Sequence, residues 1–234
     1  MNKFIFDVDG TLTPSRQKID QMFFHFFLDF CRHNLVYLVT GSDKEKTVEQ
    51  LGPEIYNSCA RVYNCLGNDI WEGNNNIYTN NWVLPDTIRE ALEFLLTKSN
   101  FSVRTGNHIE QRTGLVNFSV VGRNATLGER QLYINYDREN KERVKIANAL
   151  NEMFPTIQAS IGGETGIDII ERGRDKSQIM SHFDDDVYHL VFFGDRMDEG
   201  GNDWSLSRAI QTKGGTLYHV KGYKDTWDAL RNSY

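Results

Sequence analysis

Short apolar runs alternate with polar or amphipathic segments along most of the chain. Residues 3–6, 35–39 and 188–193 are too short for helices, and each run ends in Asp, Thr, Ser or Gly, as buried strands followed by tight turns do. Residues 19–33 and 44–51 fit helices, and the first is so aromatic that we expect it to be buried on most of its surface. The repeat of strand, loop and helix predicts an α/β fold with a doubly wound, mostly parallel sheet.

The pattern changes near residues 80–82. Two amphipathic helices and several extended segments follow, at residues 85–97, 140–154, 109–123 and 160–170. The chain returns to strand and loop patterns of the first kind at about residue 172. We therefore expect a core made of residues 1–81 and 172–234, with a separate α/β domain, residues 82–171, inserted as a cap.

Composition agrees with two folded units. The chain has 234 residues, 39% of them hydrophobic, with 14 Phe and 10 Tyr, which is ample for buried cores. No apolar run approaches the length that crosses a membrane, and no signal-peptide pattern precedes the first strand. The net charge of −6 disfavours a general nucleic-acid binder. The acidic run 184–186 is interpreted as a solvated loop without a functional role.

The cysteine content indicates a reducing compartment. Cys31, Cys59 and Cys65 are odd in number and lack the CxxC spacing of metal or redox motifs. We expect reduced thiols and a cytoplasmic location.

Two acids one residue apart follow the first strand. Asp7 and Asp9 stand in Asp-Val-Asp-Gly-Thr, and carboxylates two apart on an extended segment repel unless a cation or a proton lies between them. Asp7 can attack a phosphoryl group as a nucleophile, and Asp9 can serve as the acid and base. The alternative is an Asp-rich turn that caps a strand. The apolar strand and the complete five-residue string favour the catalytic interpretation.

Other strands end in oxygen-bearing residues. Thr40 and Ser42 follow the second strand, where hydroxyls can bind a phosphate oxygen or cap the next helix. Asp195 follows the strand 188–193, with Asn202 and Asp203 shortly after it. Ligands gather beyond the carboxyl ends of strands in such sheets. We expect Asp7, Asp9 and Asp195 to bind one Mg²⁺, supported by Asn202 and Asp203.

Basic residues supply the remaining candidates. Lys176, at an expected helix start, can neutralise a phosphorylated Asp7, or it is simply a solvated lysine. Arg112, Arg123 and Arg130 lie in the inserted domain. Three arginines in an acidic protein can hold a second phosphate away from the metal, although any one alone is usually a surface residue.

These motifs resemble known families. The string 7–11 resembles the first signature of haloacid dehalogenase-like phosphotransferases. Over nearly the whole chain the sequence resembles eukaryotic-type phosphomannomutases. The matching stretches are residues 6–13, 16–19, 41–43, 112–123, 160–163, 175–176, 192–195 and 200–203.

The resemblance implies a magnesium-dependent core with a mobile type IIB cap, usually dimeric through that cap. It implies that Asp7 is the nucleophile, Asp9 the acid/base and Lys176 the essential lysine. It assigns the metal to Asp7, Asp9 and Asp195. The hexose phosphate is assigned to Arg16, Arg112, Arg123, Arg130 and Asp168.

The sequence departs from the family pattern in three places. Gly166 aligns with a serine two residues before the sugar-binding Asp168, so a hydroxyl is lost. Residues 205–209 lack the acid that the family associates with an additional ion. Thr40 replaces a small glycine.

The leading hypothesis is therefore a mutase that interconverts mannose 6-phosphate and mannose 1-phosphate, activated by a hexose 1,6-bisphosphate. The alternative is a magnesium-dependent sugar-phosphate phosphatase, which the loss of the serine at 166 favours. A non-catalytic sugar-phosphate sensor is disfavoured because every chemical position carries a competent side chain.

Overall fold

The computed structural model describes residues 1–184 and 187–234. These residues form two compact units, one of residues 1–80 and 174–234 (the core unit), the other of residues 81–173 (the cap unit). Asp185 and Asp186 of the acidic run lie outside the described residues. Within the described part of the chain, no helix has the length and apolar character needed to span a bilayer.

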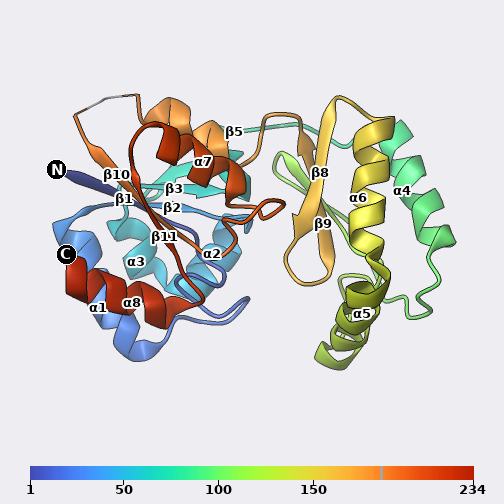
Figure 1. Ribbon diagram of the computed structural model, residues 1–234, viewed down its shortest axis with the longest axis horizontal. Coiled ribbons are helices and arrows are strands. Elements are labelled where there is room, and N and C mark those ends of the chain that lie inside the picture. The colour runs from blue at the N-terminus through green and yellow to red at the C-terminus, as the bar shows by residue number, and fades with distance from the viewer. Residues whose placement is uncertain (185–186) are drawn as a thin grey trace. The chain divides into compact units, whose positions relative to one another are not determined.

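The core unit is built on a seven-stranded sheet in the order β11-β10-β1-β2-β3-β4-β5 (Figure 1). The strands are β1 (Asn2–Phe6), β2 (Leu35–Val39), β3 (Arg61–Asn64), β4 (Asp69–Glu72), β5 (Asn75–Thr79), β10 (His189–Gly194) and β11 (Thr216–His219). The first five strands in the sheet order are parallel, and β4 and β5 form the antiparallel hairpin at one edge. The predicted doubly wound, mostly parallel sheet is confirmed.

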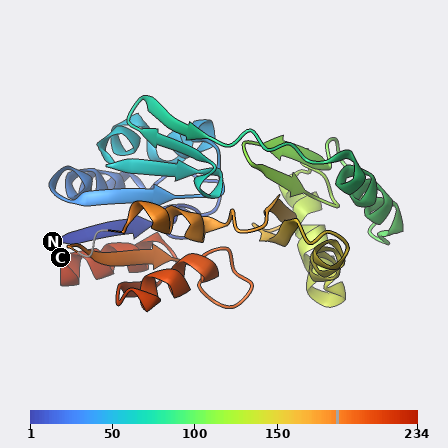
Figure 2. The same cartoon turned by 90° about the horizontal axis from the view of Figure 1, so that it is seen from above.

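Helices cover both faces of the core sheet. They are α1 (Gln21–His33), α2 (Lys44–Leu51), α3 (Pro53–Ser58), α7 (Trp204–Thr212), α8 (Tyr223–Ser233) and the 3-10 turns η1 (Cys65–Gly67) and η2 (Lys176–His182). Side chains of α1, α3 and α8 pack against one face, and those of η2 and α7 against the other. Figure 2 shows the strands of this sheet running side by side. Successive strand residues point to opposite faces, so a strand covered on both sides reads as a continuous apolar run.

The long aromatic helix expected at residues 19–33 is α1. Asp20 caps it, because the Asp20 carboxylate accepts hydrogen bonds from the backbone N–H groups of Met22 and Phe23. Phe23 and Phe27 are fully buried, whereas Met22 is exposed. The helix is thus amphipathic rather than buried on most of its surface.

The cap unit is a four-stranded antiparallel sheet with helices on one face (Figure 1). Its elements are α4 (Asp86–Lys98), β6 (Ile109–Arg112), β7 (Leu115–Phe118), α5 (Leu127–Asn140), α6 (Glu142–Met153), β8 (Ile157–Gly162) and β9 (Gly166–Glu171), with the sheet order β6-β7-β9-β8. Residues from α4 and α6 pack on Val116, Phe118, Ile167 and Ile169 of the sheet. The alternate residues of β7 and β9 therefore lie on the opposite face. We call it the polar face because it carries Asn117 and Asp168, although Leu115 and Ile170 also lie on it.

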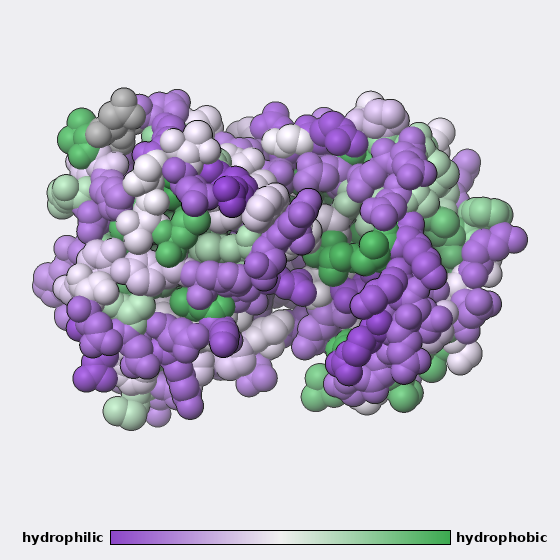
Figure 3. Space-filling model, in the orientation of Figure 1, coloured by the Kyte–Doolittle hydropathy of each residue, from purple (hydrophilic) through white to green (hydrophobic). Residues whose placement is uncertain are grey.

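Helix α5 was not predicted from the sequence. Its surface is polar almost all round, so the apolar repeat that marked the other helices is weak. A local signal was present, because Thr126 and Glu129 form a capping box at its start. Hydrophilic residues cover most of the molecular face drawn in Figure 3.

The core depends on stacked aromatic rings from adjacent strands. The Phe193 ring lies 4.8 Å from the Phe6 ring and 4.4 Å from the Tyr218 ring, centroid to centroid, and Phe193 is fully buried. The substitution Phe193→Ala should lower the free energy of unfolding by about 3–5 kcal/mol, because it leaves a cavity between two rings. Urea denaturation at pH 7 measures this. Met22→Ala, at an exposed position of the same unit, should change it by less than about 0.5 kcal/mol. Equal losses would contradict this description of the core.

Candidate active site

Three carboxylates converge beyond the carboxyl ends of β1 and β10. Asp7 follows β1, and its backbone N–H donates to the Phe193 carbonyl at 2.9 Å. Asp195 follows β10, and Asp203 precedes α7. One carboxylate oxygen from each of Asp7, Asp195 and Asp203 lies within 4.8 Å of the others. Adjacent parallel strands deliver residues far apart in the sequence to one place.

Lys176 is the cation of this cluster. Its ammonium donates to Asp7 Oδ1 at 2.5 Å and to Asp203 Oδ1 at 2.7 Å, and the lysine is completely buried. Asp175, the residue before it, caps η2 by accepting from the Ser177 N–H at 2.8 Å, which sets where the turn begins. Three carboxylates and one ammonium leave a net charge of −2 if all are ionised.

The excess negative charge changes the acidity of these groups. Burial raises the pKa of Asp7, and the carboxylates of Asp203 and Asp195 raise it further, while Lys176 opposes them. Burial, followed by Asp203, raises the pKa of Asp195 to about 6. Burial would lower the pKa of Lys176, but the Asp203 and Asp7 carboxylates outweigh it and raise the pKa. Lys176 therefore stays charged at neutral pH.

Gly10 allows the loop that follows β1 to approach Asp195. Its φ is +81°, a conformation that L-residues with a side chain rarely adopt. A Cβ at this position would lie 2.3 Å from Asp195 Oδ2, so any larger residue would push the carboxylate away. The Thr11 hydroxyl donates to Asp7 Oδ2 at 3.3 Å from the same loop.

Asp9 does not join the carboxylate cluster. Its Oδ1 accepts from the Arg16 N–H at 2.8 Å and from Gln50 Nε2 at 3.0 Å. Strand β1 ends at Phe6 and the chain turns through Gly10, so the expectation that Asp7 and Asp9 point the same way does not hold. Asp203 supplies the third clustered carboxylate instead. The roles predicted for Asp9 in catalysis and metal binding stay predictions.

The other core candidates lie at the end of β2 and in the first loop. Thr40 is buried, and its hydroxyl accepts from the Ser42 N–H at 3.1 Å. Arg16 is exposed and has a positive φ of 59°. Binding of a phosphate by these residues stays a prediction.

The cluster fits a divalent cation bound by oxygen atoms. Asp195 Oδ1 and Asn202 Oδ1 are buried and have no hydrogen-bond partner among the described residues. Buried polar atoms are normally paired, so two unpaired acceptors beside a cluster of charge −2 fit the binding of a cation. Oxygen-only ligands suit Mg²⁺ rather than a thiol- or imidazole-binding metal.

A second polar group lies on the open face of the cap sheet. The Glu110 carboxylate pairs with Arg112 Nη2 at 2.6 Å and with Arg123 Nε at 2.8 Å. Burial lowers the pKa of Arg123, Glu110 opposes this, and the nearby Arg112 and Arg130 lower the pKa further. Arg130 pairs with Glu164 at 3.1 Å. The three predicted arginines are thus close enough to influence one another, as an anion site requires.

Asn117 links the arginines to Asp168. Arg123 Nη1 donates to Asn117 Oδ1 at 3.0 Å, and Asn117 Nδ2 donates to Asp168 Oδ1 at 2.6 Å. Gly166 lies beside this pair, since a Cβ there would be 2.4 Å from Asn117 Nδ2. Roles for Arg123, Gly166 and Asp168 were predicted from the sequence, whereas the contact of Asn117 with them was not.

Residues that contact the predicted site residues but were missed include Gln50, Glu110 and Asn117. Gln50 gave no signal, because its contact with Asp9 joins positions 41 residues apart. Glu110 and Asn117 could have been found from the alternation of β6 and β7, which places Glu110, Arg112 and Asn117 on the polar face.

The chain is similar to known phosphomannomutases over most of its length. The family model described as eukaryotic phosphomannomutase matches residues 24–234. A Saccharomyces cerevisiae phosphomannomutase is 31% identical, with 86% of this chain and 83% of the relative covered. A Drosophila melanogaster phosphomannomutase is also 31% identical, with 93% and 90% covered. A haloacid dehalogenase-like hydrolase from Bacteroides thetaiotaomicron has a TM-score of 0.61 at 14% identity, with both chains fully covered.

The fold is that of the haloacid dehalogenase-like class of proteins, and an acidic cluster lies beyond the ends of two strands of the core sheet. Within that class, the chain belongs to the eukaryotic phosphomannomutase family and is an enzyme. The resemblance stated from the sequence is confirmed.

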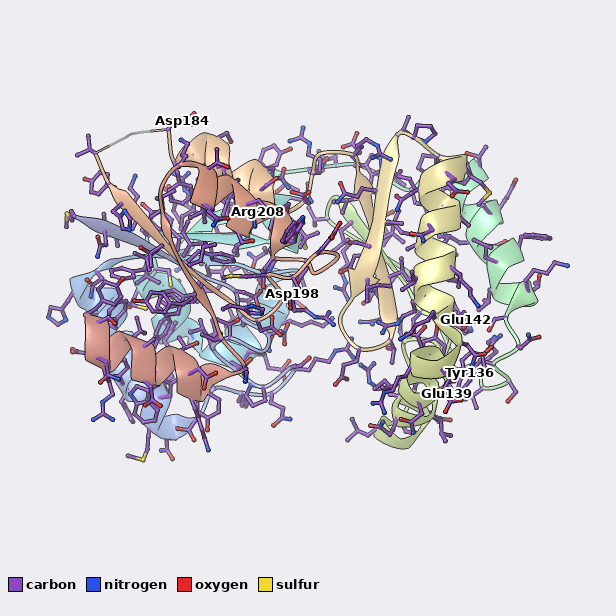
Figure 4. All side chains as sticks on the ribbon, viewed as in Figure 1. Tyr136, Glu139, Glu142, Asp184, Asp198 and Arg208 are labelled. Carbon is purple, nitrogen blue, oxygen red and sulfur yellow. The ribbon has the colours of Figure 1, made fainter. Side chains whose placement is uncertain are left out.

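The departure at residues 205–209 lies on α7. Figure 4 labels Arg208 on this helix and Asp198 in the loop after β10. The Arg208 guanidinium carbon lies 4.9 Å from the centre of the Trp204 ring, and it occupies the segment where an acid was expected from the family.

The raised pKa of Asp195 predicts how pH and metal affect stability. Between pH 4 and 6 the folded chain keeps a proton on Asp195 that the unfolded chain has lost, since its pKa rises from 3.8 to about 6. This stabilising contribution is present at low pH and is lost as pH rises through 6. In EDTA, Asp195→Asn should therefore raise the melting temperature by a few degrees at pH 7.5 and have little effect at pH 4.5.

Adding Mg²⁺ should stabilise the wild type at pH 7.5 and stabilise Asp195→Asn much less, because one ligand is lost. Asp198→Asn, an exposed acid of the same loop, is the control and should behave as the wild type. Equal metal stabilisation of both variants would exclude Asp195 as a ligand. Thermal melts with and without Mg²⁺ measure these effects.

Proposed function

We propose that this enzyme interconverts mannose 6-phosphate and mannose 1-phosphate through an aspartyl-phosphate and a hexose bisphosphate. Membership in the eukaryotic phosphomannomutase family is the observation that carries the proposal. The buried group of Asp7, Lys176, Asp195 and Asp203 supports it, because Asp7 can attack phosphorus, Lys176 supplies positive charge beside it, and the other carboxylates can bind a cation.

In the first half-reaction, an Asp7 oxygen forms a bond to phosphorus as the bond to the donor oxygen breaks. Asp9 protonates that leaving oxygen. Lys176 holds Asp7 in place at 2.5 Å and offsets negative charge on the transferring group. Mg²⁺, bound by Asp7 and Asp195 with Asp203 and Asn202 in support, would neutralise charge on the phosphoryl oxygens.

In the second half-reaction, Asp9 removes a proton from the hydroxyl at the other end of the hexose monophosphate. That oxygen attacks phospho-Asp7, which yields the bisphosphate and frees Asp7. The bisphosphate then binds in the reverse sense and returns one phosphoryl group to Asp7. Thr40, Ser42 and Arg16 are proposed to hold the transferring phosphoryl group and the sugar.

The cap unit is proposed to bind the phosphate that does not react. Arg112, Arg123 and Arg130 would bind it, and Asp168 would accept hydrogen bonds from sugar hydroxyls. Arginine suits this task because its planar fork of donors matches phosphate oxygens. Exclusion of water from phospho-Asp7 would separate a mutase from a phosphatase.

Three finer features belong to the same proposal. A hexose 1,6-bisphosphate would act as activator by phosphorylating Asp7. The enzyme would be cytoplasmic, in line with three cysteines among which no disulfide is formed in the described residues. A homodimer would form through the cap unit, as the family resemblance implies. Neither nucleic acid nor a membrane is an expected partner.

One assay separates the mutase from the phosphatase. Mannose 1-phosphate is supplied with Mg²⁺ and a hexose bisphosphate, and both mannose 6-phosphate and free phosphate are followed. Isomer should accumulate with little phosphate release. Asp7→Asn should lower the rate at least about a thousandfold, because the nucleophile is lost. Release of phosphate without isomer would establish the alternative, a sugar-phosphate phosphatase, and retained turnover in Asp7→Asn would exclude Asp7 as nucleophile.

The cap arginines predict a selective loss of substrate binding. Arg123→Ala should raise KM for mannose 1-phosphate about 10- to 100-fold, the loss expected for a charge-assisted hydrogen-bonding group. Hydrolysis of acetyl phosphate, which has no sugar and no second phosphate, should change less than about twofold. Arg138→Ala, at an exposed position on α5 of the same unit, is the matched control. Equal losses on both substrates would rule out a role for Arg123 at the distal phosphate.

A further inference from the structure

Polar residues form one continuous row across the cap sheet. The strand register pairs Glu110 with Asn117, Asn117 with Asp168, and Asp168 with Ser160. The row thus crosses all four strands on the face away from α4 and α6. Asn117 occupies its centre and is 5% exposed.

The amide of Asn117 joins a group that only donates hydrogen bonds to a group that only accepts them. The Arg123 guanidinium only donates hydrogen bonds, and the Asp168 carboxylate only accepts them. Asn117 accepts from the first at 3.0 Å and donates to the second at 2.6 Å. The amide oxygen of Asn117 therefore faces Arg123, and its NH2 group faces Asp168.

Asn117 also keeps the two charges apart. An arginine and an aspartate in direct contact form a bidentate pair that uses the donors and acceptors of both side chains. With the amide between them, Arg123 keeps a charge for an anion and Asp168 keeps acceptor capacity for hydroxyl groups. Glu110 holds the Arg123 Nε from the other side at 2.8 Å, so the guanidinium is held from both sides.

Two glycines leave room for this arrangement. The next row on the same face of the sheet contains Gly162 and Gly166, which are paired with each other. A Cβ at Gly166 would lie 2.4 Å from Asn117 Nδ2 and 3.0 Å from the Gly162 carbonyl, and one at Gly162 would lie 2.4 Å from Asp168. Neither glycine has a positive φ, so it is space rather than backbone conformation that requires glycine here.

We propose that Asn117 is a positioning residue of the hexose-phosphate site, which spaces Arg123 from Asp168, and that the absence of a side chain at Gly166 leaves room for Asn117 in this position. This inference rests on the proposed function. It identifies Asn117, rather than a hydroxyl at 166, as the group that completes the sugar-phosphate site in this chain.

Substitutions at 117 test the spacing. Asn117→Leu removes both hydrogen bonds at similar volume, and it should raise KM for mannose 1-phosphate about 10-fold or more. Asn117→Asp keeps the acceptor for Arg123 but faces Asp168 with a like charge, so it should be at least as impaired. Acetyl phosphate hydrolysis by both should stay within about twofold of wild type.

Asn151→Leu controls for loss of cap stability. Asn151 lies on α6 and also makes two hydrogen bonds, donating to the Ala159 carbonyl and accepting from the Ala159 N–H. It should lower the melting temperature while KM stays near the wild-type value. If Asn117→Leu and Asn151→Leu raise KM alike, Asn117 is merely structural and the proposal fails.

A double-mutant cycle tests the link between 117 and 166. Gly166→Ser should raise KM in the wild-type background, because the new side chain displaces Asn117 from Asp168. In the Asn117→Ala background the same change should have no such effect, since the space is then free. Improved binding by Gly166→Ser alone, or equal effects in both backgrounds, would overturn the proposal.

Direct binding keeps the inference separate from the proposed function. Calorimetry of mannose 6-phosphate with the Asp7→Asn enzyme, with and without Asn117→Leu, needs no turnover. Binding that weakens about 10-fold with Asn117→Leu, in an enzyme that fails to isomerise mannose phosphates, would reject the function and support the inference. If the wild type isomerises mannose phosphates and Asn117→Leu changes neither binding nor KM, the function is supported and the inference is rejected.

Discussion

The core unit depends on the charge imbalance at the ends of β1 and β10. Burying one carboxylate costs several kcal/mol unless it is paired, and here Lys176 pairs with Asp7 and Asp203, while a carboxylate oxygen of Asp195 lies within 4.8 Å of theirs. Under the proposed function, a bound cation would offset this negative charge when Asp7 attacks a phosphoryl group.

Several local contacts hold the three carboxylates close together despite their mutual repulsion. Gly10 lets the loop after β1 come against Asp195, and Gly194 leaves space for Asp203, since a Cβ there would lie 2.7 Å from Asp203 Oδ2. The Arg196 N–H donates to Asp203 at 3.1 Å, which holds that carboxylate toward Lys176. Aromatic packing beneath the loop, as between Phe6 and Phe193, keeps the strand ends from separating under the repulsion.

The sequence predicted the parts of this site that are local. A buried strand followed by an acid is visible in the chain itself, so Asp7 and Asp195 were placed at neighbouring strand ends and Lys176 near them. The direction of the Asp9 side chain depends on a turn through Gly10 and on Gln50, 41 residues away, and no local pattern reports such a contact. The alternation of β7 could have placed Asn117 on the polar face of the cap sheet, but its contact with Asp168 joins positions 51 residues apart and left no local signal. Helix α5 was missed because its surface is mostly polar, so its apolar residues do not recur with a clear helical period.

The charge balance of the cap site differs from that of the core site. Each of its arginines already has an acid, Glu110 for Arg112 and Arg123, and Glu164 for Arg130, so the group is close to neutral where the core is strongly negative. A phosphate must then bind by exchange of partners rather than by unopposed attraction. Glu164 is half exposed, so its ion pair with Arg130 can break at a small cost in free energy. Asn117, in contrast, prevents a direct ion pair between Arg123 and Asp168. Under the proposed function, such a site can accept the phosphate at either end of a hexose and release it again, because neither orientation meets an excess of positive charge.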